Sequence, residues 1–473
     1  MRKEYDALGE MDIDDALYFG IQTHRAVDNF TVSGQLIGDY ESFIKSLAYI
    51  KKAAALANNS LNLITDAQCD VICKAADEVL RGEMADQFPI DIFHGGGGTA
   101  ANMNIDEVMA NRANELLTGK KGYDQVHPNT HVNMCQSTND VIPSAMKMAT
   151  HAELAGLIAS LEHALGILRE KEAAFKDVVT IGRTCVQDAL PITFGQFFSG
   201  SRAAIERLIV NTKAIQEQML DLPMPGTAIG TCFGAAPGFA EAFYPRLAKI
   251  TGIPFRIGDN LYDGMQNADI WITVSAHLKA VGSIFNKISS DLRILSSGPR
   301  AGFNNLNLPA VQPGSSIMPG KVNPVMPEMM MQIGFKVFGN DCAVSLAADR
   351  GELELNIWET LILQCVMESI RLLRNGIRLL SDRCLAGIMV NEEQCRRHAA
   401  SSLALSTVLS ILEGYPFASK IAQEAADRGL SIKEVVVEKN IMAPATAERL
   451  FDPAAMTDIV VFQKLIDEYK NKK

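Results

Sequence analysis

The amino-acid sequence predicts a mainly helical, all-α protein, and three observations support this fold class. Apolar residues recur at heptad spacing between residues 271 and 295, other long amphipathic stretches flank that segment, and alternating strand patterns are few. The chain has 473 residues, more than a single hydrophobic core usually organises. We therefore expect two or three domains built mainly from helices.

The heptad segment is the strongest of these signals. Its apolar positions alternate between spacings of three and four residues, at Trp271, Val274, Leu278, Val281, Phe285, Ile288, Leu292 and Leu295. Such a seam packs against long, nearly parallel helices, and apolar stripes at 154–168, 205–219 and 355–373 predict those partners. The centre of the chain is therefore predicted to be a bundle of long helices. After Val390 the apolar runs shorten, which predicts a small helical domain.

Composition and charge argue against several classes of protein. The chain has 44 Lys and Arg against 55 Asp and Glu, a formal net charge of −11, whereas binding a nucleic acid requires a basic face. The acidic N-terminus lacks the apolar core of a signal peptide, and no uncharged apolar stretch is long enough to span a membrane. The nine scattered cysteines suit reduced thiols, so we expect a cytoplasmic protein.

The segment from Gly314 to Pro324, GSSIMPGKVNP, is the most specific candidate site. Two glycines and two prolines bracket a loop that must bend sharply, and the loop presents two hydroxyls, a lysine and an amide. Backbone N–H groups beside Gly314 and the serines suit an anion, and Lys321 adds a point charge. A surface loop with polar turn residues is the alternative interpretation.

Three further polar segments are candidates. Ser137 and Thr138, in QSTND, suit either a helix cap or an anion site at a helix start. HGGGGT at 94–99 either lets the backbone approach a ligand closely or forms a flexible turn. GRTCVQD at 182–188 is polar between apolar flanks, which indicates paired polar groups in a structural or a binding role.

Taken together, these segments resemble the aspartase/fumarase superfamily, in order and spacing, over essentially the whole chain. GSSIMPGKVNP is similar to the signature loop of that superfamily, and HGGGGTAANMN, HPNTHVNMCQSTND and IGRTCVQDALP look like its other motif blocks. Within the superfamily, VNPVMPE at 322–328 and DQFPIDIFHGG at 86–96 look more like aspartases than fumarases.

The resemblance implies a fold of three domains. These would be an N-terminal helical domain at 1–138, a central domain with a long five-helix bundle at 139–392, and a small C-terminal helical domain at 393–473. Four bundles would join into the helical core of a homotetramer, with each active site shared between subunits. The implied partner is a small anionic amino-acid substrate, with neither nucleic acid nor membrane. No dinucleotide fingerprint or zinc spacing occurs, so we expect no cofactor and no metal, while activation by a divalent cation stays open.

The implied reaction is a 1,2-elimination that yields an alkene diacid. By similarity, Ser315 is the base, acting as an alkoxide supported by loop N–H groups and Lys321. Charge then accumulates on the neighbouring carboxylate, where preorganised donors stabilise it. Lys321 and Asn323 would hold carboxylate, with Ser316 also in contact with the substrate. Glu328 is expected among the catalytic residues, because it matches a glutamate that pairs with a histidine in fumarases.

The remaining implied contacts come from earlier segments. By similarity, Thr99, Ser137 and Thr138 bind the carboxylate that takes up charge. Asn139 would face the leaving amine, and Thr184 would bind the second carboxylate.

The sequence departs from the family pattern at two places in the implied site. Cys185 stands where fumarases have His and aspartases have His or Gln. It is also expected to contact the substrate, but it cannot form the His–Glu pair of a fumarase. In GTAIGTCFGAAPGF at 226–239, Cys232, Phe233 and Gly234 replace Gly-Leu-Asn, which makes that wall more apolar. These changes bear on the substrate rather than on the superfamily.

Removal of ammonia from L-aspartate to give fumarate is the function that the sequence favours. The alternative is a divergent carbon–nitrogen lyase with the same mechanism on another amino acid or a betaine, similar to an ergothionase that eliminates trimethylamine. Fumarate hydratase is less favoured. A non-enzymatic relative, like the crystallins recruited from this superfamily, would be expected to lack Ser315 or Lys321, and both are present.

Overall fold

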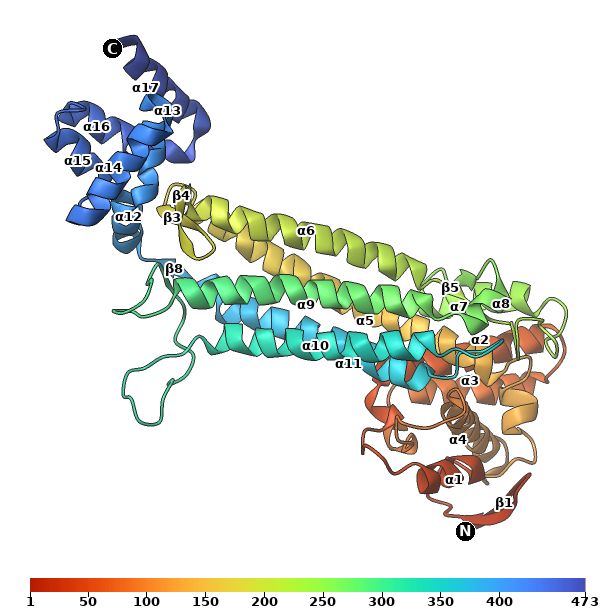
Figure 1. Cartoon of the computed structure of the whole chain (residues 1–473). Helices are drawn as coiled ribbons and strands as arrows, with labels where there is room; N and C mark the ends of the chain where they lie inside the picture. The colour runs from red at the N-terminus through yellow and green to blue at the C-terminus, as the bar shows by residue number, and fades with distance from the viewer. Residues whose placement is uncertain (473) are drawn as a thin grey trace. The chain divides into compact units, whose positions relative to one another are not determined.

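The computed structural model describes residues 1–472, and the predicted mainly helical architecture is confirmed (Figure 1). The chain forms two compact units. Unit 1 contains residues 1–159, 210–282 and 334–374, and unit 2 contains 160–209, 283–333 and the described residues from 375 onward. The division into domains at 138 and 392 stays a prediction.

Five long helices each contribute one segment to each unit. They are α5 (Thr138–Ala174), α6 (Phe194–Gln218), α9 (Asp269–Leu295), α10 (Val325–Asp349) and α11 (Glu359–Arg383). The heptad prediction is confirmed, because α9 spans the seam and every seam residue except Leu295 is buried. The stripe predicted from Leu355 begins too early. Helix α11 starts at Glu359, because Asn356 Oδ1 accepts from the N–H of Trp358 at 3.0 Å in a turn before the helix.

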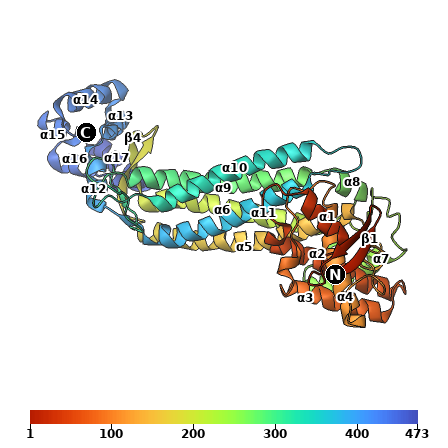
Figure 2. The ribbon, with the colours of Figure 1, turned by 90° about the horizontal axis from the view of Figure 1, so that it is seen from below.

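Unit 1 packs the N-terminal elements around α2 (Figures 1 and 2). Helix α2 contacts α3 and α7, and α3 contacts α4. Strands β1 and β2 pair antiparallel, and β5 and β6 pair parallel. The elements are β1 (Arg2–Asp6), β2 (Gly9–Ile13), α1 (Ile21–Asn29), α2 (Glu41–Ser60), α3 (Asp66–Leu80), α4 (Thr99–Thr118), β5 (Asp221–Leu222), α7 (Phe239–Thr251), β6 (Arg256–Ile257) and α8 (Leu261–Gln266), with 3-10 turns Ile37–Asp39 and Ala85–Gln87 and a π turn Pro128–Val132.

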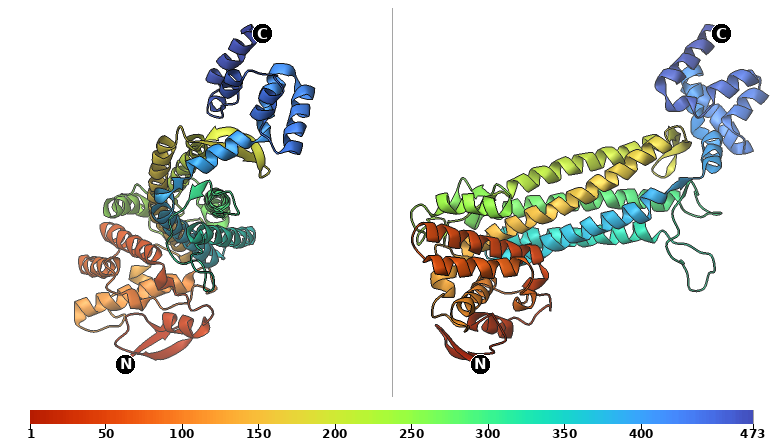
Figure 3. Two further views of the ribbon diagram at one scale, coloured as in Figure 1. Left: turned by 90° about the vertical axis from the view of Figure 1, so that its left-hand side faces the viewer. Right: turned by 180° about the vertical axis from the view of Figure 1, so that it is seen from behind.

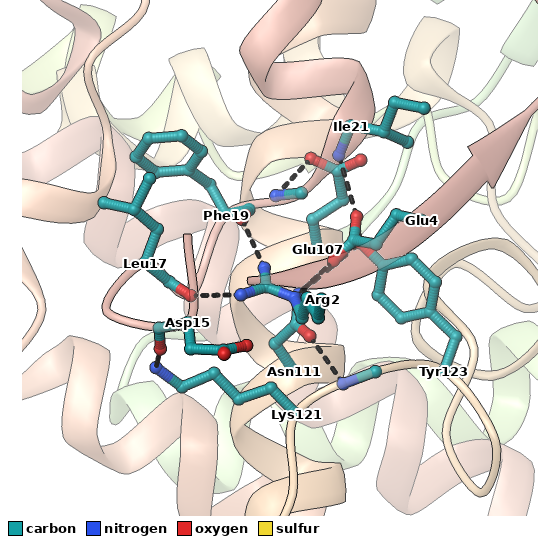
Figure 4. A network of polar contacts seen from close by, with 12 residues as sticks. Arg2, Glu4, Asp15, Leu17, Phe19, Ile21, Glu107, Asn111, Lys121 and Tyr123 are labelled. Atoms are coloured by element: carbon teal, nitrogen blue, oxygen red, sulfur yellow. Dashed lines mark hydrogen bonds and ion pairs between the residues drawn. The ribbon is translucent and has the colours of Figure 1, made fainter. Parts of the chain in front are cut away.

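Helix α1 is capped by carboxylates from distant parts of the chain (Figure 4). Glu107 of α4 accepts from the N–H groups of Gly20 at 2.9 Å, Gln22 at 2.8 Å and Thr23 at 3.0 Å, and from the Thr23 hydroxyl at 2.7 Å. Glu4 accepts from the N–H of Ile21 at 2.8 Å. Burial raises the pKa of Glu107 to about 7, and its hydrogen-bond donors oppose that rise. These bonds satisfy the N–H groups that every helix start leaves open.

Unit 2 contains two small sheets and the helices that end the chain (Figure 3). Strands β3 (Val179–Thr184) and β4 (Gln187–Thr193) form an antiparallel hairpin, and β7 (Leu306–Asn307) pairs antiparallel with β8 (Met389–Val390). The predicted terminal helices are α12 (Glu392–Ser401), α13 (Ser406–Glu413), α14 (Tyr415–Arg428), α15 (Ile432–Glu438), α16 (Pro444–Leu450) and α17 (Ile459–Lys472), with 3-10 turns Leu385–Gly387, Leu403–Leu405 and Ala455–Thr457. Helices α13 to α17 share one hydrophobic cluster between Leu405 and Ile466.

Across residues 1–472, none of the helices combines the length and the apolar character that a membrane crossing requires.

The carboxylate cap of α1 gives a stability prediction. Above pH 7, where the Glu107 carboxylate is ionised, Glu107→Gln replaces an acceptor-only group by an amide whose NH2 faces N–H donors, so the free energy of unfolding should fall by about 2–3 kcal/mol. The control is Glu83→Gln, because Glu83 pairs with Arg81 on the exposed surface and should cost less than about 1 kcal/mol. Thermal unfolding of both variants measures the difference, and equal midpoints for the two would contradict the capping role.

Candidate functional site

The glycine run before Thr99 is a tight turn that starts α4. Gly96, Gly97 and Gly98 have φ angles of +80°, +57° and +81°, a conformation that side chains with a Cβ rarely adopt. A Cβ on Gly98 would also lie 2.8 Å from Ile142 Cγ1. Thr99 is exposed at the first position of α4, and its hydroxyl donates to Gly96 O at 2.7 Å. Thr99 also lines a cavity of about 380 Å³ in unit 1.

Ser137, Thr138 and Asn139 lie where α5 begins, so the capping interpretation describes the local structure. The Ser137 hydroxyl accepts from the N–H of Asn139 at 3.3 Å, and the Ser137 N–H donates to Asp140 Oδ1 at 2.9 Å. Asp140 also accepts from the N–H of Thr227 at 2.8 Å, and Asn139 Nδ2 donates to a carbonyl in the same 226–239 loop. Burial raises the pKa of Asp140 to about 7, against the effect of these N–H donors. Asp140 therefore ties the predicted substrate segment to the loop that departs from the family pattern.

A buried lysine, Lys51, is linked by hydrogen bonds to the start of α5. Lys51 of α2 is fully buried and lies 2.9 Å from Asp106 Oδ1, measured from Nζ. It donates to Asn102 Oδ1 and to Asn133 Oδ1, each at 2.8 Å. The Asn102 amide in turn donates to the Thr138 hydroxyl at 3.3 Å. The chain from Asp106 to Thr138 thus connects helices α2 and α4 with the start of α5.

Thr184 and Cys185 lie at the exposed tip of the β3–β4 hairpin in unit 2. Thr184 pairs with Gln187, which leaves Cys185 and Val186 as the two residues of the turn. Their φ angles are +53° and +63°, the pattern of a hairpin turn that usually contains Asn and Gly. A β-branched valine in this region is strained. The tip therefore needs support from the surrounding structure to keep Thr184 and Cys185 in place.

The segment from Gly314 to Asn323 forms a closed loop with a narrow neck. The N–H of Gly314 donates to Lys321 O at 2.8 Å, and Asn323 Nδ2 donates to Gly314 O at 2.8 Å. A Cβ on Gly314 would lie 2.6 Å from the Asn323 nitrogen and 2.7 Å from the Lys321 carbonyl oxygen, so a larger residue does not fit. The neck fixes both ends of the loop that carries Ser315 and Ser316. Ser315 is half-buried and Ser316 is exposed.

The Ser315 hydroxyl oxygen is held by two backbone donors. It accepts from the N–H of Met318 at 2.9 Å and from the N–H of Ile317 at 3.2 Å. Hydrogen bonds to an oxygen favour its negatively charged form. This arrangement is therefore able to lower the cost of deprotonating the hydroxyl.

Two other predicted positions lie apart from these contacts. Glu328, in the first turn of α10, faces Arg293 with 3.9 Å between Oε1 and Nε, a long and half-exposed ion pair. Phe233, in the altered 226–239 loop of unit 1, is 87% exposed and therefore available to a ligand or to another chain. Within residues 1–472 no hydrogen bond or ion pair of one chain joins the tip at Thr184 to the 314–323 loop.

Sequence reasoning missed Lys51, Asp106 and Asp140 as parts of the site. One signal for Lys51 was present, because it occupies the apolar face of a predicted helix, with Leu47 and Ala54 one turn away and fully buried. A charge on a core face needs a buried partner, but which residue supplies it depends on the tertiary fold.

Comparison with known proteins places the chain in a family. The family described as Lyase matches residues 9–339, and the family described as Fumarase C C-terminus matches residues 405–458. Among curated relatives, the aspartate ammonia-lyase of Helicobacter pylori is 41% identical over 98% of this chain and 99% of its own length. That of Bacillus subtilis is 41% identical over 96% of each. A crystal structure of fumarate lyase:delta crystallin from Brucella melitensis bound to cobalt superposes with a TM-score of 0.93 at 40% identity, covering 97% of this chain and 99% of that one.

The chain belongs to this lyase family, the aspartase/fumarase superfamily, and has its mainly helical fold. Within the superfamily it is an aspartase-like enzyme of the carbon–nitrogen lyase class.

The buried pair behind Thr138 gives a stability prediction with a neighbouring control. Lys51→Met leaves the Asp106 carboxylate buried without a cation and should lower the free energy of unfolding by about 3–5 kcal/mol. Lys52→Met removes the adjacent, partly exposed pair with Asp77 and should cost about 1 kcal/mol or less. The double variant Lys51→Met/Asp106→Leu removes both buried charges and should recover most of the loss. Chemical denaturation of the three variants tests this, and equal losses for Lys51→Met and Lys52→Met would refute the account.

Proposed function

We propose that this protein removes ammonia from L-aspartate and releases fumarate, with Ser315 as the base. The observation that carries the proposal is the full-length similarity to aspartate ammonia-lyases together with the closed loop that presents Ser315 to backbone donors. The loop supplies a hydroxyl whose oxygen is already hydrogen-bonded, with Lys321 as a nearby cation in the sequence.

The reaction balances without an external oxidant or reductant. The Ser315 oxygen takes the proton from the carbon next to one carboxylate of aspartate. The electron pair of that C–H bond first moves onto the carboxylate and then forms the double bond. The bond between the neighbouring carbon and nitrogen breaks, and ammonia leaves with its electron pair. The largest charge develops on the carboxylate, so fixed hydrogen-bond donors are the main catalytic device.

We assign those donors to the start of α5 and α4. Thr99, Ser137 and Thr138 bind the carboxylate that takes up charge, and Asn139 faces the leaving amine. The support for this assignment is their placement at helix starts, where N–H groups and the helix dipole favour an anion. The chain of bonds from Lys51 through Asn102 holds Thr138 in one orientation.

The second group of assignments lies in the hairpin and the loop. Thr184 binds the other carboxylate, Lys321 and Asn323 hold carboxylate beside Ser315, and Cys185 and Ser316 line the pocket. Glu328 is assigned a supporting role because it faces Arg293 rather than a histidine.

We further propose a cytoplasmic homotetramer in which each active site combines segments from different copies of the chain. The support is the exposure of Phe335, Phe338 and Leu346 on α10, because large apolar side chains on one helix usually face a partner. The substrate is a small anionic amino acid, and stimulation by a divalent cation is open to direct assay.

A second candidate is elimination from a substrate with a bulkier or methylated nitrogen. It is favoured by Cys185 in place of a side-chain donor and by the exposed Phe233 in the altered loop, both of which suit an apolar group.

The direct test is an ultraviolet assay for alkene formation. The purified protein is given aspartate, malate and a panel of N-substituted amino acids and betaines, each with and without a divalent cation. We expect the highest kcat/KM on aspartate. Turnover of malate or of a betaine with none on aspartate would overturn the proposal.

The base assignment gives a second prediction. Ser315→Ala should lower kcat by about 10²–10⁴-fold, the usual effect of a positioned base. Ser296→Ala serves as the control, because it removes a hydroxyl directly after α9, outside the assigned site. A Ser315→Ala enzyme with kcat within tenfold of the unmodified protein would exclude Ser315 as the base.

Cys185 distinguishes the two candidate substrates. If aspartate is the natural substrate, the site works without a donor at position 185, so Cys185→His should change kcat/KM on aspartate by less than about tenfold, the effect of one hydrogen bond. A larger gain on aspartate, measured in the same assay, would favour the bulkier amine instead.

A further inference from the structure

A cluster of polar side chains lies directly behind the hairpin tip in unit 2. It consists of Arg183, Phe303, Asn305, Cys395 and His398, and we call it the His398 cluster. Arg183 precedes Thr184 in β3, and because side chains alternate along a strand, the two point to opposite faces. Arg183 therefore faces away from the implied substrate and into the protein.

Arg183 is held mainly by planar contacts and weak polar ones. Its guanidinium carbon lies 4.4 Å from the centre of the Phe303 ring, a cation–π arrangement. Its Nη2 lies 3.5 Å from His398 Nδ1, and the Asp188 carboxylate is 3.8 Å from Nε. The side chain is 11% exposed. The cation is thus positioned by an aromatic face and an imidazole rather than by a tight ion pair.

His398 joins the hairpin to two other segments. It belongs to α12, and its Nδ1 lies 3.3 Å from Asn305 Nδ2. Asn305 also contacts Cys395 of α12, with 3.2 Å between Nδ2 and Sγ, and its carbonyl accepts from the N–H of Asn391 at 3.0 Å. Asn305 directly precedes β7, the strand that leads into the 314–323 loop. The cluster therefore connects the hairpin of Thr184, the strand before the Ser315 loop, and α12.

The surroundings of His398 require a neutral imidazole. Arg183 has only donors, so the His398 Nδ1 that lies 3.5 Å from Arg183 Nη2 must accept, and the Nδ1 of an imidazolium cannot. Asn305 Nδ2 lies 3.3 Å from the same ring nitrogen, and Gln394 Nε2 lies 2.7 Å from His398 Nε2. Burial is the main cause that lowers the pKa of His398, the charges of Arg183 and Arg397 lower it further, and the charge of Asp188 opposes them.

We propose that Arg183 and His398 are positioning residues that fix the strained hairpin tip at Thr184 through the His398 cluster, and that protonation of His398 releases it. The tip needs such support because Cys185 and Val186 adopt left-handed backbone conformations. Neither residue contacts substrate in this assignment. The consequence for turnover rests on the proposed function, whereas the consequence for the hairpin does not.

The direction of the pH effect follows from the state that the cluster needs. The folded pKa of His398 lies below its unfolded value of 6.5. The support is therefore complete above pH 6.5 and weakens as the pH falls below it. Lowering the pH from 7.5 to 5.5 should loosen the hairpin.

Hydrogen exchange tests the cluster without any assay of activity. The segment 179–193 is followed by mass spectrometry at pH 7.5 and 5.5, corrected for intrinsic exchange, in the full-length protein and in two variants. The unmodified hairpin should lose at least about threefold in protection at pH 5.5. His398→Gln offers a neutral acceptor at both pH values and should abolish this pH dependence. His398→Phe offers no acceptor and should lower the protection of the hairpin at both pH values.

Kinetics then tests positioning. When Thr184 is less firmly held, substrate binding should weaken more than the rate of the chemical step falls. His398→Phe should therefore raise KM for aspartate by about tenfold, with a smaller change in kcat. His398→Gln should have the KM of the unmodified protein. Arg183→Lys, which keeps the charge but loses the planar contact, should resemble His398→Phe.

Each outcome decides one claim. The proposal that the His398 cluster supports the hairpin is overturned by either of two results. One is equal protection of the hairpin at both pH values, and the other is equal protection in His398→Phe and in the unmodified protein. Altered exchange with unchanged KM overturns the positioning role. Absence of aspartate turnover in the unmodified protein refutes the proposed function but leaves the exchange result to decide the cluster.

Discussion

The candidate chemistry depends on the neck of the 314–323 loop. Two hydrogen bonds join Gly314 to Lys321 and Asn323, and no side chain fits at Gly314. With its ends fixed, the loop can turn its own N–H groups onto the Ser315 oxygen. A serine hydroxyl in water is a poor base because its alkoxide is costly, so donors that are already in place are what make the assignment chemically reasonable.

The other candidate segments are also held in place by hydrogen bonds formed in advance. The proposed binding residues stand at the ends of helices and strands, while buried or half-buried polar groups fix those elements from the protein side. Asp106, Lys51 and Asn102 support Thr138, Asp140 joins Ser137 to Thr227, and the His398 cluster supports the hairpin tip. Since a buried polar group left without its partner costs free energy, these bonds restrict the proposed binding residues to few orientations. Preorganisation of this kind is what an elimination through a charged intermediate requires.

Much of the fold could be predicted from the sequence because it depends on local periodicity. The seam from Trp271 to Leu292 needs only apolar spacing to identify α9, and the QSTND segment carries its own helix cap. The start of α11 could not be placed, because the apolar stripe continues through Leu355 and Trp358 while the turn at Asn356 depends on a side-chain bond. Motif spacing likewise located the 314–324 loop but gave no information about its neck.

The supporting residues were harder to predict for a physical reason. Lys51 and Asp106 are 55 residues apart in numbering, and Arg183 and His398 come from a hairpin and a terminal helix, so only the tertiary fold pairs them. Cys185 stood out against the family pattern, yet its strained backbone became visible only in the structure.

The central claim, that Ser315 moves the carbon-bound proton, can be tested most directly in the reverse direction. The protein is incubated with fumarate and ammonia in D2O, and the product is followed by proton NMR. The account predicts aspartate carrying a single deuterium on the carbon that bears no nitrogen, formed by the unmodified protein and lost in Ser315→Ala. Deuterated aspartate formed by Ser315→Ala at the unmodified rate would contradict it.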